Sequence, residues 1–193
     1  MTTRISELLA SAAPRTVAVV RGITDDQLDL STPCSEFAVR GLLGHLFEVV
    51  VNFQALARKE QVEWGFGADL LGRPDWRDRF AVETDRAIEA WSDPSALEGV
   101  SPMGMPQPML GSLVVMDMTV HAWDLARATG QPFEPAPEVL SELHDVVVKL
   151  APTARERGVF GAEVPVPADA PVFDRLLGLA GRDPGWAPPS AAE

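Results

Sequence analysis

The chain has a single cysteine, Cys34, so an internal disulfide bond is excluded. It also lacks any apolar run that approaches the roughly 20 residues needed to cross a bilayer. Its first residues, Met-Thr-Thr-Arg-Ile-Ser-Glu, have no apolar core of the kind found in a signal peptide. Scarcity of cysteine is typical of a reducing compartment. We therefore expect a cytoplasmic protein with no membrane partner.

Basic residues are also scarce. The chain carries 16 lysines and arginines against 28 aspartates and glutamates, and its formal net charge at pH 7 is −12. An acidic surface repels phosphate backbones, so a nucleic acid is not expected as a partner. With 193 residues, 46% of them hydrophobic, the chain is long and apolar enough to bury a core. We expect a single domain over residues 1–186 and a frayed tail over residues 187–193.

Apolar residues recur along most of the chain with the 3.6-residue period of an α-helix. The pattern predicts helices over residues 4–21, 36–59, 76–92, 110–129, 136–151 and 170–179. Pro14 lies inside the first of these, so that helix is expected either to kink there or to start later. Ser35 is the expected N-cap of the second helix, and Gly130 is the residue expected to end the fourth.

Two segments are rich in residues that break helices. Glycine and proline interrupt residues 60–75, which are expected to form a connection, and residues 93–108, which are expected to form a loop without regular structure. The tail after Gly158 combines alternation with prolines and is expected to be partly extended. Four main helices, one additional helix and few strand signals indicate an all-α bundle.

Asp117 and His121 lie four residues apart in the fourth expected helix, so their side chains lie one above the other on one face. Asp124 falls within the same narrow arc, on the side that apolar neighbours mark as inward. His45 lies at the border of the apolar stripe of the second expected helix. If His45 projects toward the same point, three side chains can reach one small ion.

Two imidazoles and one carboxylate suit a divalent metal. Zinc accepts this set in catalytic sites that keep an open position, and iron or nickel are alternatives because imidazole suits them too. A bound zinc can lower the pKa of its water or of a coordinated thiol. Asp124, close to His121, is expected to orient a metal-binding side chain without binding the metal itself. Arg127 is expected either to pair with Asp124 or to reach an anionic substrate.

Plainer interpretations stand beside each of these hypotheses. An acid and a histidine at this spacing also occur by chance, in which case His121 is a core histidine and Asp117 a surface or paired acid. His144 has no acid or histidine at ligand spacing on an inward face and is interpreted as structural. Cys34 is either a reactive thiol near a helix N-terminus or a small buried hydrophobe, and the second is the commoner fate of a free cysteine.

Three methionines, Met103, Met105 and Met109, lie in the proline-rich loop. Methionine is a common gap filler in cores, but in this loop the three side chains could instead line the mouth of a pocket.

Three stretches resemble the DinB-like proteins of the mycothiol-dependent maleylpyruvate isomerase type. They are residues 32–34 (Thr-Pro-Cys), 39–45 (Val-Arg-Gly-Leu-Leu-Gly-His) and 117–130 (Asp-Met-Thr-Val-His-Ala-Trp-Asp-Leu-Ala-Arg-Ala-Thr-Gly). Residues 170–186 also match a branch of that family. The resemblance implies an up-down-down-up four-helix bundle that binds a divalent metal near one end.

Carried over from the family, the metal ligands are His45, Asp117 and His121. The characterised isomerase has a glutamate in the place of Asp117, and many relatives have a second histidine there. The shorter aspartate needs a closer backbone approach. Phe37 and Ala38 stand where relatives often carry tryptophan and threonine, which removes a helix cap but no ligand.

The resemblance implies an enzyme that binds a small thiol similar to mycothiol and delivers its thiolate to a small electrophile, by isomerisation through an adduct or by S-transfer. A non-catalytic module that binds a metal or small ligand is the alternative, because a fold does not fix a function. A third hypothesis is a purely structural homodimer, which predicts no metal in the purified protein.

Overall fold

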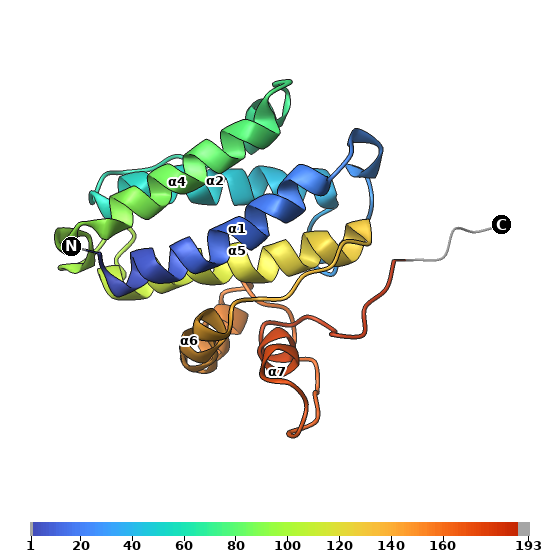
Figure 1. Ribbon diagram of the computed structural model, residues 1–193. Coiled ribbons are helices and arrows are strands. Elements are labelled where there is room, and N and C mark those ends of the chain that lie inside the picture. Colours follow the sequence, from blue (N-terminus) through green and yellow to red (C-terminus); the bar gives the residue numbers. More distant parts are fainter. Residues whose placement is uncertain (1, 189–193) are drawn as a thin grey trace.

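The computed structural model describes residues 2–188, and within that range the chain is all-helical, without a strand. Figure 1 shows its α-helices and the two short 3₁₀ helices that accompany them. Their bounds are α1 Arg4–Gly22, η1 Asp25–Gln27, α2 Val39–Ala57, α3 Gly67–Leu71, α4 Trp76–Ser92, η2 Pro94–Leu97, α5 Gln107–Thr129, α6 Pro137–Glu156 and α7 Val172–Leu179.

The helices α1, α2, α4 and α5 form a four-helix bundle in which α1 and α2 each contact both α4 and α5. In Figure 1, α1 and α5 run in one direction, and α2 and α4 run in the other. This is the up-down-down-up order that the family resemblance implies. Two consecutive helices can run the same way because the segment between α2 and α4 returns along the bundle, and its Gly67 lies directly against Gly44 near the start of α2.

The helix termini explain most of the observed boundaries. Thr3 caps α1, because its hydroxyl accepts a hydrogen bond from the backbone N–H of Ser6. Helix α1 then runs through Pro14 to Gly22, so it does not start later. Gly130 adopts a left-handed backbone, φ 70°, and ends α5 as predicted.

The start of α2 differs from the prediction. The helix begins at Val39 after Ala38, which makes no side-chain cap, so the expectation of a cap at Ser35 and a start at residue 36 is wrong. The buried Thr32 explains the difference, because its hydroxyl donates to the carbonyl oxygen of Phe37 at 2.8 Å. That bond holds residues 32–37 in a loop and delays the helix.

Several prolines lie within helices instead of interrupting them. The segment expected to lack regular structure contains η2, and α5 begins there, at Gln107. Pro94 is the first residue of η2 and Pro108 is the second residue of α5, both within a first turn, where a missing N–H costs nothing. Helix α6 likewise continues beyond residue 151 through Pro152. The expected connection over residues 60–75 contains the short helix α3.

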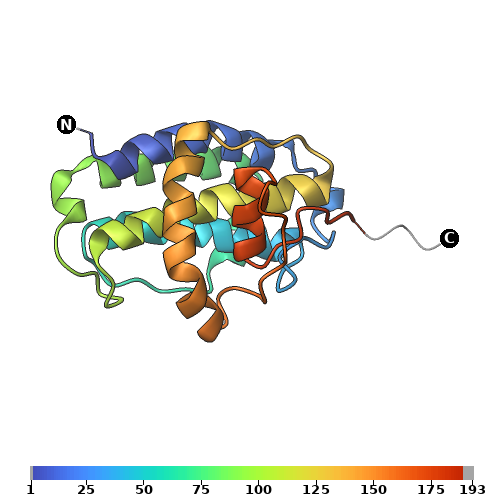
Figure 2. The same cartoon turned by 90° about the horizontal axis from the view of Figure 1, so that it is seen from below.

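Helices α6 and α7 lie side by side across the bundle and cover α5 (Figure 2). The segment between them has no strand among the described residues, and its Val164 donates to the carbonyl of Gly178 at 3.0 Å. Of the tail expected to fray, residues 189–193 lie outside the described residues.

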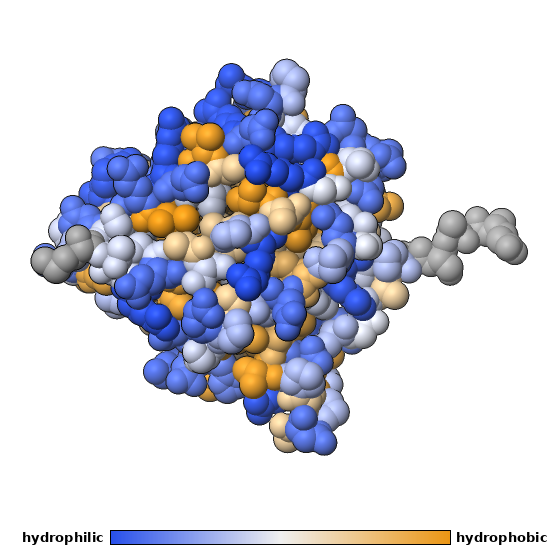
Figure 3. All heavy atoms as spheres, viewed as in Figure 1, coloured by the Kyte–Doolittle hydropathy of each residue, from blue (hydrophilic) through white to orange (hydrophobic). Residues whose placement is uncertain are grey.

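The surface of the bundle is mostly hydrophilic on the face seen in Figure 1. Figure 3 shows smaller hydrophobic groups between the hydrophilic residues. Within residues 2–188, no helix is both long and apolar enough to cross a membrane.

Candidate metal centre

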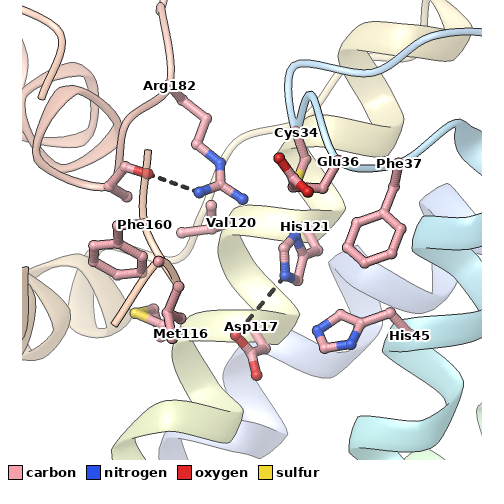
Figure 4. A pocket seen from close by; sticks show the side chains of 13 residues that line it. Cys34, Glu36, Phe37, His45, Met116, Asp117, Val120, His121, Phe160 and Arg182 are labelled. Atoms are coloured by element: carbon pink, nitrogen blue, oxygen red, sulfur yellow. Dashed lines mark hydrogen bonds and ion pairs between the residues drawn. The ribbon is translucent and has the colours of Figure 1, made fainter. Parts of the chain in front are cut away.

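The structure brings together the three side chains predicted to bind a metal. His45 comes from α2, and Asp117 and His121 come from α5. One ligand atom from each lies within 4.8 Å of the other two. The Nε2 atom of His121 lies 3.9 Å from Oδ1 of Asp117, and the His45 and His121 rings meet edge to face with centroids 5.1 Å apart. Figure 4 shows the three side chains facing one another.

The surroundings of His45 favour the neutral imidazole, which is the form that binds metals. The ring of Phe37 stacks on the imidazole, with the two ring centroids 5.7 Å apart and an interplanar angle of 11°. Burial lowers the pKa of His45, although the charge of Asp117 raises it in part. Burial therefore favours a neutral imidazole with a free lone pair, as metal binding requires.

His121 is buried, and Asp124 orients its ring from the Nδ1 side, away from Asp117. Its Nδ1 atom lies 3.0 Å from Oδ2 of Asp124, a side chain with no exposed surface. A carboxylate only accepts hydrogen bonds, so the tautomer of a neutral His121 that this contact favours has the proton on Nδ1 and the lone pair on Nε2, the atom on the Asp117 side. This carboxylate–histidine pair is the usual support of a metal-binding histidine.

Arg182, from the segment after α7, completes this support. Its Nη2 atom donates to Oδ2 of Asp124 at 3.3 Å, and its Nη1 atom donates to the carbonyl of Ala180 at 2.7 Å. The guanidinium is itself buried, with 7% of the residue exposed. Nothing in the local sequence pattern signals this pair, because the partners lie 58 residues apart.

The first cavity at the site has a volume of about 310 Å³. Figure 4 shows Cys34 and Arg182 on its wall together with the three predicted ligands. Cys34 is half-buried, and burial raises the pKa of its thiol although the charge of Arg182 lowers it in part. The other lining residues are Glu36, Phe37, Met116, Val120, Gly158, Val159, Phe160 and Ala180.

Cys34, His121 and Asp124 form a second group whose ligand atoms lie within 4.8 Å of one another. Asp124 can still offer Oδ1, which has no hydrogen-bond partner in the described part of the chain. A cation there would lie against the buried guanidinium of Arg182 and would require a thiol that burial keeps protonated. The group of His45, Asp117 and His121 carries neither cost and is therefore the better candidate for a metal site.

A larger cavity of about 490 Å³ adjoins the first. The two share His45 and Asp117, and also Met116, Val159 and Phe160. Met103, Met105 and Met109 line the larger cavity, which confirms the pocket interpretation of these methionines. Two cavities therefore reach the same pair of candidate ligands.

Arg127 and His144 are not brought to this site. The exposed side chain of Arg127 donates to the carbonyl of Trp186 at 2.6 Å and lies 5.9 Å from the centre of the Trp123 ring. Neither residue lines either cavity. The arginine that pairs with Asp124 is Arg182.

The helical order and the helix-borne histidines define a DinB-like bundle. Residues 9–126 match the family described as the mycothiol maleylpyruvate isomerase N-terminal domain. The chain therefore belongs to that family, as the resemblance predicted. The match spans α1 to α5 and ends before α6 and α7 begin.

Two proteins of Mycobacterium tuberculosis are similar over most of their length. They are Uncharacterized protein MT0763 of strain CDC 1551 / Oshkosh and Uncharacterized protein Rv0738 of strain ATCC 25618 / H37Rv. Each is 31% identical over 175 residues, which cover 86% of this chain and 90% of the relative. No solved structure matches the chain.

Proposed function

We propose that His45, Asp117 and His121 bind one divalent metal ion, with zinc as the first candidate, and that the protein transfers a small thiol of the mycothiol type to an electrophile. Membership of the mycothiol maleylpyruvate isomerase family supports the thiol. The convergence of two imidazoles and one carboxylate supports the metal.

The residues present fit a zinc ion. Two atoms that bond one tetrahedral zinc at about 2.0–2.2 Å lie about 3.3–3.6 Å apart, and the 3.9 Å between Nε2 of His121 and Oδ1 of Asp117 exceeds that separation by only a few tenths of an ångström, which a small side-chain rotation closes. The shorter arm of aspartate, compared with the glutamate of the characterised isomerase, is therefore no obstacle to this pair. Burial also favours the neutral form of His45, which a metal requires.

A zinc ion in this site would lower the pKa of a coordinated thiol and supply a thiolate near neutral pH. The chain's own residues perform the positioning. Asp124 holds the ring of His121, and Arg182 holds Asp124. Phe37 holds the ring of His45. We assign the smaller cavity, with Cys34, Glu36 and Arg182 on its wall, to the thiol because it is the more polar of the two.

Two cavities meet at His45 and Asp117. This observation is the main support for a reaction between two substrates. A module that only holds a metal needs one opening, whereas a transferase must bring two molecules to one point. The larger cavity is free to admit the electrophile while the smaller one holds the thiol.

The test is conversion of the electrophile by the zinc-loaded protein in the presence of mycothiol, with a panel of electrophiles that includes maleylpyruvate. S-transfer consumes the thiol, whereas isomerisation through an adduct returns it unchanged, so both the electrophile and the thiol are measured. Conversion should require zinc and mycothiol, should be lost in Asp117→Ala and should persist in His144→Ala, a matched control outside both cavities. Zinc binding without conversion of any electrophile would instead identify a non-catalytic metal-binding module.

A further inference from the structure

The larger cavity combines an apolar wall with two cationic side chains. Its volume of about 490 Å³ lies in the range of small-molecule sites. Four methionines and three aromatic rings contribute to the wall, and methionine adapts its shape to irregular ligands. The apolar residues are Val49, Phe53, Trp64, Met103, Met105, Met109, Leu110, Leu113, Met116, Leu150, Ala154, Val159 and Phe160.

The cations Lys149 and Arg157 lie eight residues apart at the C-terminal end of α6 and on the residue that caps it. Leu150, Thr153 and Ala154 line the cavity between them, so one face of this helix forms part of the wall. Eight residues correspond to about 12 Å along a helix. The two long side chains can therefore both reach the opening of the larger cavity.

Neither cation is neutralised within the described residues. Lys149 and Arg157 form no ion pair there, whereas the neighbouring Arg155 pairs with Glu163 at 3.2 Å. The chain has 28 acidic residues, yet within residues 2–188 the only one that lines this cavity is Asp117, at the end shared with the smaller cavity. Two unpaired cations over an apolar wall match a ligand that carries an anionic group on an apolar body.

We propose that the larger cavity binds the electrophilic substrate, and that this substrate is an apolar carboxylate whose carboxyl group is held by Lys149 or Arg157. That the bound carboxylate is a substrate rests on the proposed function. A carboxylate gains charge-assisted hydrogen bonds from either side chain. Its alkyl or aryl body occupies the apolar wall, which continues to Met116 and Asp117 at the shared end.

The test compares octanoate with octanamide, which has nearly the same shape but no charge. Calorimetric titrations use the zinc-loaded full chain and the same chain after the metal is removed with a chelator. We expect octanoate to bind about tenfold more tightly than octanamide in both forms, because hydrogen bonds to a charged group are the stronger ones. The double variant Lys149→Ala/Arg157→Ala should lose this preference and keep its affinity for octanamide.

Two further variants complete the design. The control Arg15→Ala/Arg21→Ala also removes two positive charges, but from residues outside both cavities, and it should leave the preference unchanged. Leu113→Trp narrows the cavity and should weaken both ligands. Equal affinities for the two ligands, or a preference that survives in the Lys149 and Arg157 variant, would overturn the proposal.

A preference that disappears when the metal is removed would also overturn it, because the carboxylate would then be bound by the metal. These results are distinguishable from a failure of the proposed function. Octanoate binding by the metal-free chain does not depend on zinc content or on thiol consumption.

Discussion

Replacement of Asp124 by asparagine tests the support behind His121 and changes little in volume. The carboxylate has no exposed surface and interacts with two groups through one oxygen, Oδ2. Nδ1 of His121 lies 3.0 Å from that oxygen, and Nη2 of Arg182 lies 3.3 Å from it. Asp124→Asn removes the negative charge that both partners face.

Two separate effects should follow. Breaking a buried ion pair by removing one partner costs about 3–5 kcal/mol, and Arg182, with 7% of its surface exposed, would be left without its counter-charge. Loss of the carboxylate behind a metal-binding histidine reduces metal affinity by about 10–100-fold. The first effect lowers the free energy of unfolding of the metal-free chain, and the second lowers the affinity for zinc.

The assays are urea unfolding of the metal-free protein and zinc affinity by competition with a chromophoric chelator. The double variant Asp124→Asn/Arg182→Met separates the effects, because it removes the orphaned cation without restoring the carboxylate. It should recover most of the lost stability but none of the zinc affinity. A zinc affinity for Asp124→Asn within twofold of the native value would refute the assigned role of Asp124.

Two further predictions concern the neighbourhood of the site. Cys34→Ala should retain full zinc occupancy by elemental analysis, because Cys34 belongs to the less favourable ligand group; loss of zinc in this variant would move the site to Cys34, His121 and Asp124. Glu48→Gln should lower the free energy of unfolding by about 1–3 kcal/mol in urea titrations, because the Glu48 carboxylate is buried and accepts from the backbone N–H groups of Gly65 and Gly67 at 2.9 and 2.7 Å. Unchanged stability would contradict that role of Glu48.

Features that depend on the periodicity of one helix, such as which side chains share a face, could be predicted from the sequence. The spacing of Asp117, His121 and Asp124 places them on one face wherever α5 begins, so starting the helix at residue 107 instead of 110 does not disturb the site. Helix α4 has its predicted bounds for the same reason. The approach of His45 required the relative placement of α2 and α5, and the resemblance to a known family supplied that placement.

Features that depend on distant contacts could not be predicted. Helical spacing put Arg127 near Asp124 in sequence, but the tail after α7 supplies Arg182 instead. Cys34 reaches the cavity because Thr32 holds its loop at the start of α2. Proline predicts a break, but Pro94 and Pro108 lie in the first turn of η2 and α5, where proline is compatible with a helix.

Elemental analysis of the purified protein tests the central claim most directly. The account predicts about one zinc equivalent per chain, bound through the three-ligand set of a site with an open position. Zinc should be lost in His45→Ala, Asp117→Ala and His121→Ala and kept in His144→Ala. Full metal occupancy in His121→Ala, or a native protein that binds no divalent metal, would contradict it.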